Sequence, residues 1–260
     1  MRDLFWLSDE AWAVLEPHLP KNQPGKPRVD DRRVISGILH ILKTGGRWRD
    51  VPPEYGPTKT IYNRYTRWAR RGVWQRIFAK VAAAGAVPHE LCLDSTHVKA
   101  HRSASGGKLG EFSQAVGVSR GGRTTKIHCL ADARGRIVAL ALALALALAL
   151  TPGNIADITM ALPLLESMRP TERLIADKAY DADRLRKWLI DRQIEPVIPG
   201  RAARDVVYPL NRRAYRRRNV IERMFGRLKN WKRIATRYDR LAIKYLAAIA
   251  LIATVTQWLG

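Results

Sequence analysis

LCLDST, residues 91–96, is a short apolar run that ends in a carboxylate, and ERLIAD, residues 172–177, repeats that pattern. Short apolar runs with polar boundaries are typical of strands buried within a sheet. In open α/β sheets, ligands bind beside the carboxyl ends of the strands. The two segments therefore predict a sheet that holds Asp94 and Asp177 at one edge, where two carboxylates can bind a hard cation such as Mg²⁺. Taken singly, each aspartate is better explained as a residue that begins a turn or caps a helix.

The neighbouring segments complete an ordered series of strands and helices. Five segments are predicted strands: 91–96, 125–132, 137–150, 172–177 and 195–200. Four helices are predicted at 157–168, 183–193, about 212–232 and in the apolar C-terminal segment. Three strands in a meander followed by strand–helix units form the layout of an RNase H-like domain. We therefore expect an α/β fold with a mixed five-stranded sheet and flanking helices.

The N-terminal third of the chain has a different pattern. Residues 1–85 predict a separate all-helical domain, and residues 86–260 then form the sheet domain. Ser8 is expected to cap a first helix, a second helix spans residues 31–43, and Thr58 is expected to cap a third.

The third helix, TKTIYNRYTRWARRG, is basic and carries Arg64 and Arg67 among its aromatic residues. Two helices joined by a Gly/Pro-rich turn, the second of them basic, favour a helix-turn-helix DNA-binding unit. We therefore assign Arg64 and Arg67 to DNA contacts. A small helical bundle with a solvated basic face is nearly as well supported by this segment alone.

The chain is strongly basic. Its 260 residues include 46 Lys and Arg against 23 Asp and Glu, which gives a net charge of +23 and an isoelectric point near 10.8. A polyanionic partner is expected, nucleic acid before membrane, and a merely soluble basic protein is the alternative.

The longest apolar run has 14 residues, fewer than the roughly 20 of a membrane-spanning helix. The protein is expected to be cytoplasmic and nucleoid-associated, with Cys92 and Cys129 as reduced core residues.

A basic helix near residue 220 carries one notable carboxylate. Residues 201–240 hold 14 Lys and Arg against 3 Asp and Glu, which is about half of the net charge of the chain. Tyr215, Arg218, Glu222 and Lys229 fall at about 0°, 300°, 340° and 320° around a helix that turns roughly 100° per residue. This stripe can place a carboxylate at a metal site while cations hold phosphates on either side. An ordinary ion pair between Glu222 and Arg218 is the simpler alternative.

These residues and their spacing resemble bacterial insertion-sequence transposases of the DDE class. The pattern Tyr215-x2-Arg218-x3-Glu222-x6-Lys229 is similar to the segment around their catalytic glutamate. LCLDSTHVKAH and LIADKAYDAD resemble the segments around their two aspartates, and SRGGRTTKIHCLADARGR resembles the block between them. LSDEAWAVLEPHLP and WRDVPPEYGPTKTIYNRYTRWARRGVWQRIF resemble the N-terminal region of the IS-five family. The resemblance covers nearly the whole chain in order, and the helical pattern and the TTKIH block are its specific parts.

The resemblance implies a catalytic, metal-binding triad of Asp94, Asp177 and Glu222. Two Mg²⁺ ions, for which Mn²⁺ can substitute, would activate first a water and then a DNA 3′-OH, and would stabilise the leaving oxygen. The implied activity is cleavage of transposon ends followed by strand transfer of the 3′-OH into target DNA.

The family also implies how DNA is held. Tyr215, Arg218 and Lys229 would contact the DNA backbone near the cut. The implied partner is double-stranded DNA, both the terminal inverted repeats and the target. A homodimer or higher assembly is expected on paired ends.

Two further acidic residues compete for the second position of the triad. Asp177 is preferred over Asp181 and Asp183 because it ends the predicted strand, whereas Asp183 is expected to cap the following helix. Three histidines lie near these blocks: His97, His101 and His128. His128 could approach the site from its predicted strand, but a core or supporting role is expected.

The predicted third strand contains a repeat of Ala-Leu pairs over residues 139–150. The resemblance implies a strand of about six residues here, so the run from Ile137 to Leu150 has eight residues in excess. An even insertion keeps each side chain on its face of the sheet. Fully extended, however, the run would be about 50 Å long, against about 17–20 Å for an ordinary strand. We interpret the run as a repeat expansion, lying in an edge strand, that has no function of its own.

Three functions are compatible with this pattern. The first is an active transposase, which the three intact carboxylates favour. The second is a catalytically impaired DNA-binding remnant, in which the expansion at 139–150 distorts the site. The third is a nuclease that cuts DNA without joining it.

Overall fold

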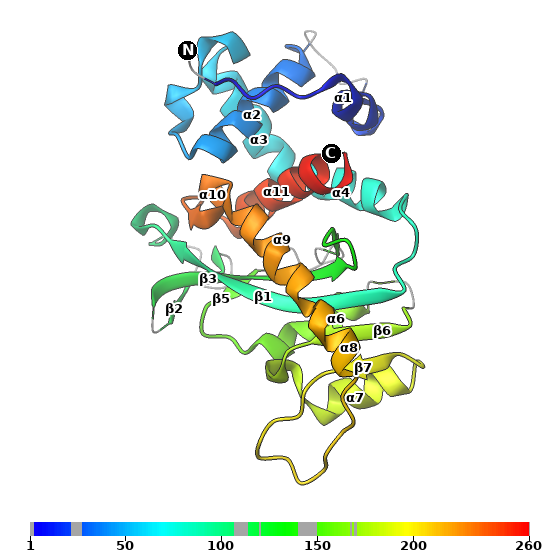
Figure 1. The fold of residues 1–260 in the computed structure, drawn as a ribbon. Coiled ribbons are helices and arrows are strands. Elements are labelled where there is room, and N and C mark those ends of the chain that lie inside the picture. Colours follow the sequence, from blue (N-terminus) through cyan, green and yellow to red (C-terminus); the bar gives the residue numbers. More distant parts are fainter. Residues whose placement is uncertain are drawn as a thin grey trace.

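The computed structural model describes residues 3–21, 28–106, 114–119, 121–139, 150–166, 168 and 171–259. A mixed β-sheet lies at its centre, with helices on both sides (Figure 1). The strands are β1 Glu90–Ala100, β2 Gly117–Ser119, β3 Gly122–Asp132, β4 Ile137–Ala139, β5 Leu150–Pro152, β6 Arg173–Ala176, β7 Glu195–Val197 and β8 Thr236–Arg237. The α-helices are α1 Asp9–Leu15, α2 Asp31–Thr44, α3 Thr58–Arg70, α4 Val73–Ala83, α6 Ala161–Leu165, α7 Asp183–Ile190, α8 Arg212–Tyr215, α9 Asn219–Lys229, α10 Lys232–Ala235 and α11 Ala242–Ala253.

The strand order confirms the predicted mixed sheet. The main path runs β2-β3-β1-β6-β7, with β4 and β5 also paired to β3, and β8 paired to β1. β3 is antiparallel to β1, whereas β6 is parallel to both β1 and β7. Each of the five predicted strand segments contributes residues to this sheet, and the described ends of the third pair with β3 as β4 and β5. The short strands β2 and β8 were not predicted.

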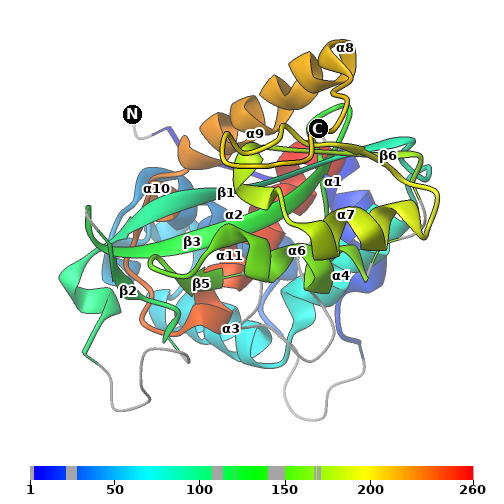
Figure 2. The same ribbon diagram turned by 90° about the horizontal axis from the view of Figure 1, so that it is seen from below.

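The two faces of the sheet carry different helices. Because successive side chains of a strand point to opposite faces, Asp94 and Thr96 share one face of β1 and Ser95 lies on the other. Asp94 and Thr96 bond to side chains of the α8–α9 segment, and Ser95 bonds to Asp157 beside α6. Helix α8, the 3₁₀ turn after it and α9, residues 212–229, form what we call the α8–α9 rod. Figures 1 and 2 show this rod crossing the sheet, with α6 and α7 on the side away from α11.

The N-terminal helices rest on the C-terminal helix. Helix α11 is buried along almost its whole length, and it packs against α3 and α4. The Tyr65 hydroxyl donates a 2.6 Å hydrogen bond to the Lys244 carbonyl oxygen. One cluster of buried apolar residues extends through these helices and the sheet. The division into domains at residue 85 stays a prediction. Within the described residues, no helix is long and apolar enough to cross a membrane.

The helix starts were predicted in part. Ser8 caps α1 by accepting a hydrogen bond from the Ala11 backbone N–H, as predicted. The prediction for Thr58 is wrong: Pro57, in an extended conformation, is the cap residue, and Thr58 is the first residue inside α3.

The connection between α2 and α3, residues 45–57, contains two 3₁₀ turns. This is longer than the three or four residues of a typical helix-turn-helix, so that detail of the prediction is not confirmed.

The predicted helix over residues 212–232 is interrupted. A 3₁₀ turn, Arg216–Arg218, separates α8 from α9, and α9 ends at Lys229. Asn211 caps the start of α8 by accepting a 3.0 Å hydrogen bond from the Ala214 backbone N–H. The rod nevertheless crosses the sheet as one body (Figure 1).

The ends of the Ala-Leu run lie in the sheet, while residues 140–149 lie outside the described residues. Ala139 pairs with Leu130 of β3, and Leu150 pairs with Ile127. Ten residues therefore separate Ala139 from Leu150, whereas only two separate their partners on β3. The register of β5 is displaced from that of β4 by the same eight residues that the sequence has in excess.

Candidate active site

The two predicted aspartates lie at neighbouring strand ends. β1 and β6 run parallel, and Leu93 pairs with Ala176, so the next residues in the two strands are Asp94 and Asp177. The residues that precede Asp94 are completely buried, which fixes the position of its backbone. Asp177 also caps a 3₁₀ turn, Lys178–Tyr180, by accepting a 2.8 Å hydrogen bond from the Ala179 N–H. The capping role and a place in the candidate site are therefore compatible.

Arg218 connects Asp94 with the third predicted carboxylate. Its Nη1 donates to Asp94 Oδ2 at 2.8 Å, and its Nη2 donates to Glu222 Oε1 one turn further along the helix. The other oxygen of Asp94, Oδ1, accepts a 2.7 Å hydrogen bond from the Ser95 N–H. Glu222 is the most exposed of the three side chains, at 55% against 21% for Arg218 and 15% for Asp94. One guanidinium thus joins the sheet to the α8–α9 rod.

The electrostatics link the three carboxylates. Burial is the main cause that raises the pKa of Asp94, to about 6, and the negative charges of Asp177 and Glu222 raise it further. The Ser95 N–H and the Arg218 guanidinium act in the opposite direction. Asp94 therefore lies in a place where negative charge is costly and where a cation is favoured.

The other members of the helical stripe also face the sheet. Lys229 Nζ donates a 2.7 Å hydrogen bond to Thr96 Oγ1, on the same face of β1 as Asp94. Partial burial lowers the pKa of Lys229. Tyr215 is partly buried against the core. Arg218 and Lys229 thus contact β1 directly despite the interruption of the helix, and Glu222 is joined to β1 through Arg218.

The two competing aspartates have structural roles. Asp181 is buried and accepts hydrogen bonds from Arg186, Arg204 and the Arg201 N–H, at 2.6–2.8 Å. Burial opposes its ionisation, but these donors outweigh burial and lower the pKa of Asp181 to about 2. Asp183 pairs with Arg204 at 2.6 Å. The prediction that Asp183 caps α7 is wrong, because Ala182 is the cap residue and Asp183 is the first helical residue.

The predicted metal ligands do not form a closed cage. Among the residues that the structure describes, no three His, Cys, Asp or Glu side chains lie close enough together to hold a metal ion. The Arg218 guanidinium bonds to both Asp94 and Glu222, and this arrangement keeps the two carboxylates on either side of it. The site is a carboxylate cluster around an arginine.

Two family descriptions match this chain. The description "Putative transposase of IS4/5 family" matches residues 7–78, and "Transposase DDE domain" matches residues 86–256, which include all three carboxylates. The chain belongs to the DDE transposase family. The mixed sheet with flanking helices agrees with the RNase H-like fold that this transposase family implies.

Several relatives of this transposase come from insertion sequences. A putative transposase for element IS6501 from Brucella ovis is 32% identical over 137 residues, covering 52% of this chain and 98% of that protein. A putative transposase for element IS402 from Burkholderia cepacia is 32% identical over 145 residues, covering 52% of this chain and 63% of that protein. An uncharacterised 16.2 kDa protein of IS402, also from Burkholderia cepacia, is 36% identical over 118 residues, covering 40% of this chain and 79% of that protein. No solved structure matches the transposase.

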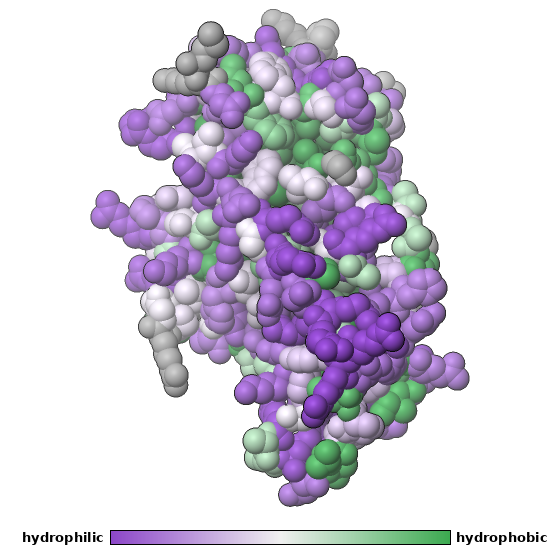
Figure 3. Space-filling view, in the orientation of Figure 1, coloured by the Kyte–Doolittle hydropathy of each residue, from purple (hydrophilic) through white to green (hydrophobic). Residues whose placement is uncertain are grey.

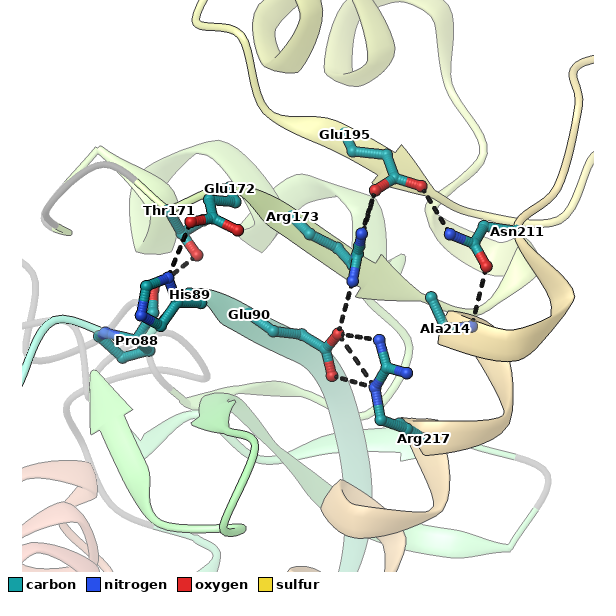
Figure 4. Close-up of polar contacts among 10 residues, drawn as sticks. All are labelled: Pro88, His89, Glu90, Thr171, Glu172, Arg173, Glu195, Asn211, Ala214 and Arg217. Carbon is teal, nitrogen blue, oxygen red and sulfur yellow. Dashed lines mark hydrogen bonds and ion pairs between the residues drawn. The ribbon is translucent and has the colours of Figure 1, made fainter.

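A network of ion pairs that the sequence did not reveal fastens the α8–α9 rod of the transposase to the sheet (Figure 4). Glu90, at the start of β1, accepts hydrogen bonds from Arg217 at 2.5–3.1 Å and pairs with Arg173 of β6 at 3.4 Å. Arg173 in turn bonds to Glu195 of β7, which accepts a 3.0 Å bond from Asn211. Because Arg217 precedes Arg218, this network holds the arginine of the site in place. Its only signal in the sequence was that Glu90 and Asp94 share a face of one strand.

The histidines lie away from the carboxylates. His128 is buried on the opposite face of the sheet, with Nε2 2.8 Å from Thr151 Oγ1, and burial lowers its pKa to about 4. His97 Nε2 lies 3.3 Å from the Gly153 carbonyl oxygen. His101 contacts Ser103 and the ring of Tyr238. The expected core role of His128 agrees with its burial. Cys92 and Cys129 are buried and unpaired, as predicted.

The exposed face of the transposase beside the site is basic. Hydrophilic side chains cover the face on which α9 lies (Figure 3). Five arginines of the α8–α9 rod are exposed: Arg212, Arg213, Arg216, Arg223 and Arg227.

The two arginines predicted on α3 have different surroundings. Arg67 is exposed, in line with Lys59, Asn63 and Arg70 along the helix. Arg64 is 5% exposed, forms an ion pair with Asp31 of α2, and stacks on Trp68. The assignment of Arg64 to DNA contact is corrected on this ground, because its buried guanidinium holds α2 against α3.

Proposed function

We propose that this transposase cuts DNA at the ends of its element and joins the freed 3′-OH to target DNA. The observation that carries the proposal is that Arg218 bonds to both Asp94 and Glu222, while Asp177 follows the residue that pairs with Leu93 on the neighbouring strand. Exposed arginines lie along the same α8–α9 rod. Phosphoryl transfer needs oxygen ligands for cations together with basic side chains that hold phosphates. Both kinds of group lie here within one site.

The carboxylates are ligands of the chemical kind that divalent cations prefer, although with Arg218 between Asp94 and Glu222 the described residues form no three-ligand cage. Asp94, Asp177 and Glu222 offer hard oxygen ligands, which suit Mg²⁺ or Mn²⁺. Burial first, and the neighbouring carboxylates second, raise the pKa of Asp94, and a bound cation would offset both effects. Two such ions would activate the attacking water or 3′-OH and stabilise the leaving oxygen.

Arg218 would exchange partners during this function. Its guanidinium bonds to Asp94 and Glu222, and it must leave them for these carboxylates to act as cation ligands. Once released, a planar guanidinium can hold a DNA phosphate with two parallel hydrogen bonds. Lys229, whose ammonium lies beside Thr96, would hold a second phosphate. Tyr215 would contact the backbone from the start of the rod.

DNA would lie along the basic rod and reach the N-terminal helices. The exposed stripe of Lys59, Asn63, Arg67 and Arg70 gives α3 a surface for phosphate or groove contacts. A helix-turn-helix function of this region and the pairing of two copies on two ends both belong to the proposal.

Cleavage of DNA that carries the element's own ends tests the proposal. The wild-type chain, a Glu222→Gln variant and a variant lacking residues 143–150 are compared with and without Mg²⁺. Mg²⁺-dependent nicking at the ends that is lost in Glu222→Gln, followed by joined products, is the expected result. Nicks without joined products would indicate a nuclease. The proposal would be contradicted if the wild-type chain and the chain lacking residues 143–150 both bind the ends but neither cuts them.

The displaced register of β5 favours one alternative, an impaired DNA-binding remnant. Removal of residues 143–150 leaves Leu142 next to Thr151, so that Leu142 takes the place of Leu150 opposite β3. Cleavage by the shortened chain alone would assign the impairment to the repeat.

A further inference from the structure

A polar pocket lies between the N-terminal helices and the segment that follows α9. Its volume is about 480 Å³, within the range of about 300–1,000 Å³ that is common for ligand sites. Trp48 and Tyr62 line it from the N-terminal side, and Tyr238, Asp239 and Lys244 line it from the other. The pocket is separate from the carboxylate cluster, and none of the functions described above uses it.

Aromatic rings form the walls of this pocket. The Trp48 and Tyr62 rings lie 5.6 Å apart at 58°, and Tyr62 and Tyr238 are each 37% exposed. The Arg233 guanidinium lies 5.2 Å from the Trp48 ring and 5.4 Å from the Tyr238 ring. Exposed rings beside cations are the arrangement on which nucleic-acid bases stack.

The rim and floor of the pocket are mainly cationic. Lys244 Nζ lies 3.0 Å from the Tyr62 hydroxyl and 4.8 Å from the centre of that ring. Arg240 is exposed, and its side chain has no hydrogen-bond or ion-pair partner among the described residues. Arg47 is exposed and pairs with Asp50. A phosphate at the rim would therefore meet Arg240, whose side chain is unpaired among the described residues, and Arg47, whose ion pair with Asp50 is exposed to solvent.

Asp239 adds an unsatisfied acceptor. The residue is 8% exposed, and within the described part of the chain its Oδ2 has no hydrogen-bond partner, with Arg233 Nη1 3.9 Å away. A buried acceptor without a donor is costly. Because this oxygen is closed to solvent, Asp239 contributes negative charge to the floor of the pocket and no direct contact from Oδ2 to its contents.

We propose that this pocket binds one unpaired nucleotide of the DNA substrate. The base would stack on the exposed part of the Tyr238 ring, and Arg240 would hold its phosphate. This inference rests on the proposed function, because it takes the partner to be DNA. β8, just before Tyr238, pairs with Lys99 and Ala100 of β1, six residues beyond Asp94. At about 3.3 Å per residue this is about 20 Å, so the nucleotide would not be the one that is cut.

Binding of fluorescent oligonucleotides tests this assignment. Two duplexes of one sequence are compared, one fully paired and one with a single unpaired guanine, in the presence of a chelator so that no cleavage occurs. The wild-type chain should bind the second duplex more tightly. Tyr238→Ala should weaken that binding by at least about fivefold, and Tyr238→Phe, which keeps the ring, by less than about twofold. Binding of the paired duplex should change little in either variant.

Further variants and a competitor complete the test. Arg240→Ala should weaken binding of the unpaired duplex, whereas Arg184→Ala, which removes an exposed arginine from α7, should not. Equal binding of the two duplexes by the wild-type chain, or no effect of Tyr238→Ala, would overturn the proposal. Displacement of the DNA by free guanosine monophosphate at similar concentration would overturn the assignment to DNA in favour of a free nucleotide. Because binding is measured in chelator, where no cleavage occurs, failure of cleavage and failure of this pocket are distinguishable.

Discussion

Asp94 and Arg64 are both largely buried charged residues, but one belongs to the candidate site and the other joins two helices. Asp94 is ionised at a cost, because burial and two neighbouring carboxylates raise its pKa to about 6 from an ordinary 3.8. Burial also lowers the pKa of Arg64, to about 10, but its ion pair with Asp31 joins α3 to α2. Functional sites commonly keep such unfavourable charges, whereas structural sites neutralise them.

Asp94→Asn should therefore stabilise the protein at neutral pH. Between pH about 4 and about 6, Asp94 stays protonated in the folded protein but is ionised in the unfolded chain. The free energy of unfolding therefore falls as the pH rises through this window. Above it the cost is about 1–3 kcal/mol, which Asn removes. Denaturation in chelator-containing buffer should show the variant more stable at pH 8 and equal to the wild type near pH 3. A less stable variant at pH 8 would contradict this account of Asp94.

Arg64→Ala and Arg67→Ala form a matched pair on α3. Loss of Arg64 leaves the nearly buried Asp31 with Arg28 as its one charged partner among the described residues, and should lower the free energy of unfolding by about 3 kcal/mol. Arg67→Ala should change that free energy by less than about 0.5 kcal/mol. It should instead reduce the slope of log affinity for DNA against log salt by about 1. The reverse pattern in denaturation and binding titrations would place the DNA contact at Arg64.

At the scale of elements, the Ala-Leu run is the clearest departure from an ordinary sheet. Both of its ends pair with β3, but their registers differ by eight residues. The excess was visible in the sequence, because an alternating pattern of 14 residues is too long for one strand. The sequence could not indicate that both ends stay paired, since this depends on the hydrogen bonds that β3 offers.

A chain lacking residues 143–150 should form one continuous strand along β3. Because the connection from β4 to β5 is then shorter, its closure costs less entropy, and stability should rise by about 1–2 kcal/mol. Hydrogen exchange should be slower at the joined strand, and the midpoint of urea unfolding should increase. A fall in stability would mean that the repeat contributes to packing.

The element boundaries near the site were predicted less well than the elements themselves. Strands β1 and β6 were predicted from apolar runs, because burial on both faces leaves a clear pattern. The break in the rod at Arg216–Arg218 and the Glu90–Arg217 network were not, because both depend on contacts between residues far apart in the sequence. The sequence favours Asp177 over Asp181 because Asp177 ends the predicted strand. Asp181 instead pairs with two arginines, which gives it a structural role.

At the scale of the whole molecule, the last helix joins the first ones to the sheet. Tyr65 of α3 bonds to Lys244 of α11, and the buried apolar residues form one cluster. The sequence predicted two domains because its pattern changes near residue 85, but a pattern of this kind says nothing of contacts between distant segments.

This shared core predicts a single cooperative unfolding transition. Calorimetry and near-ultraviolet circular dichroism should report the same midpoint, because α3 and α4 lose their partner when α11 unfolds. Two resolved transitions would indicate that residues before about 85 fold independently.

We propose that Asp94, Asp177 and Glu222 form one cation-binding centre when Arg218 releases Asp94 and Glu222. Binding of Mn²⁺, followed by electron paramagnetic resonance in the presence of uncleavable end DNA, tests it without any dependence on turnover. We predict that Asp94→Asn, Asp177→Asn and Glu222→Gln each lose bound Mn²⁺, whereas Asp183→Asn, which removes an exposed carboxylate nearby, binds it normally. Normal Mn²⁺ binding by all three variants, or its loss in Asp183→Asn, would contradict the account.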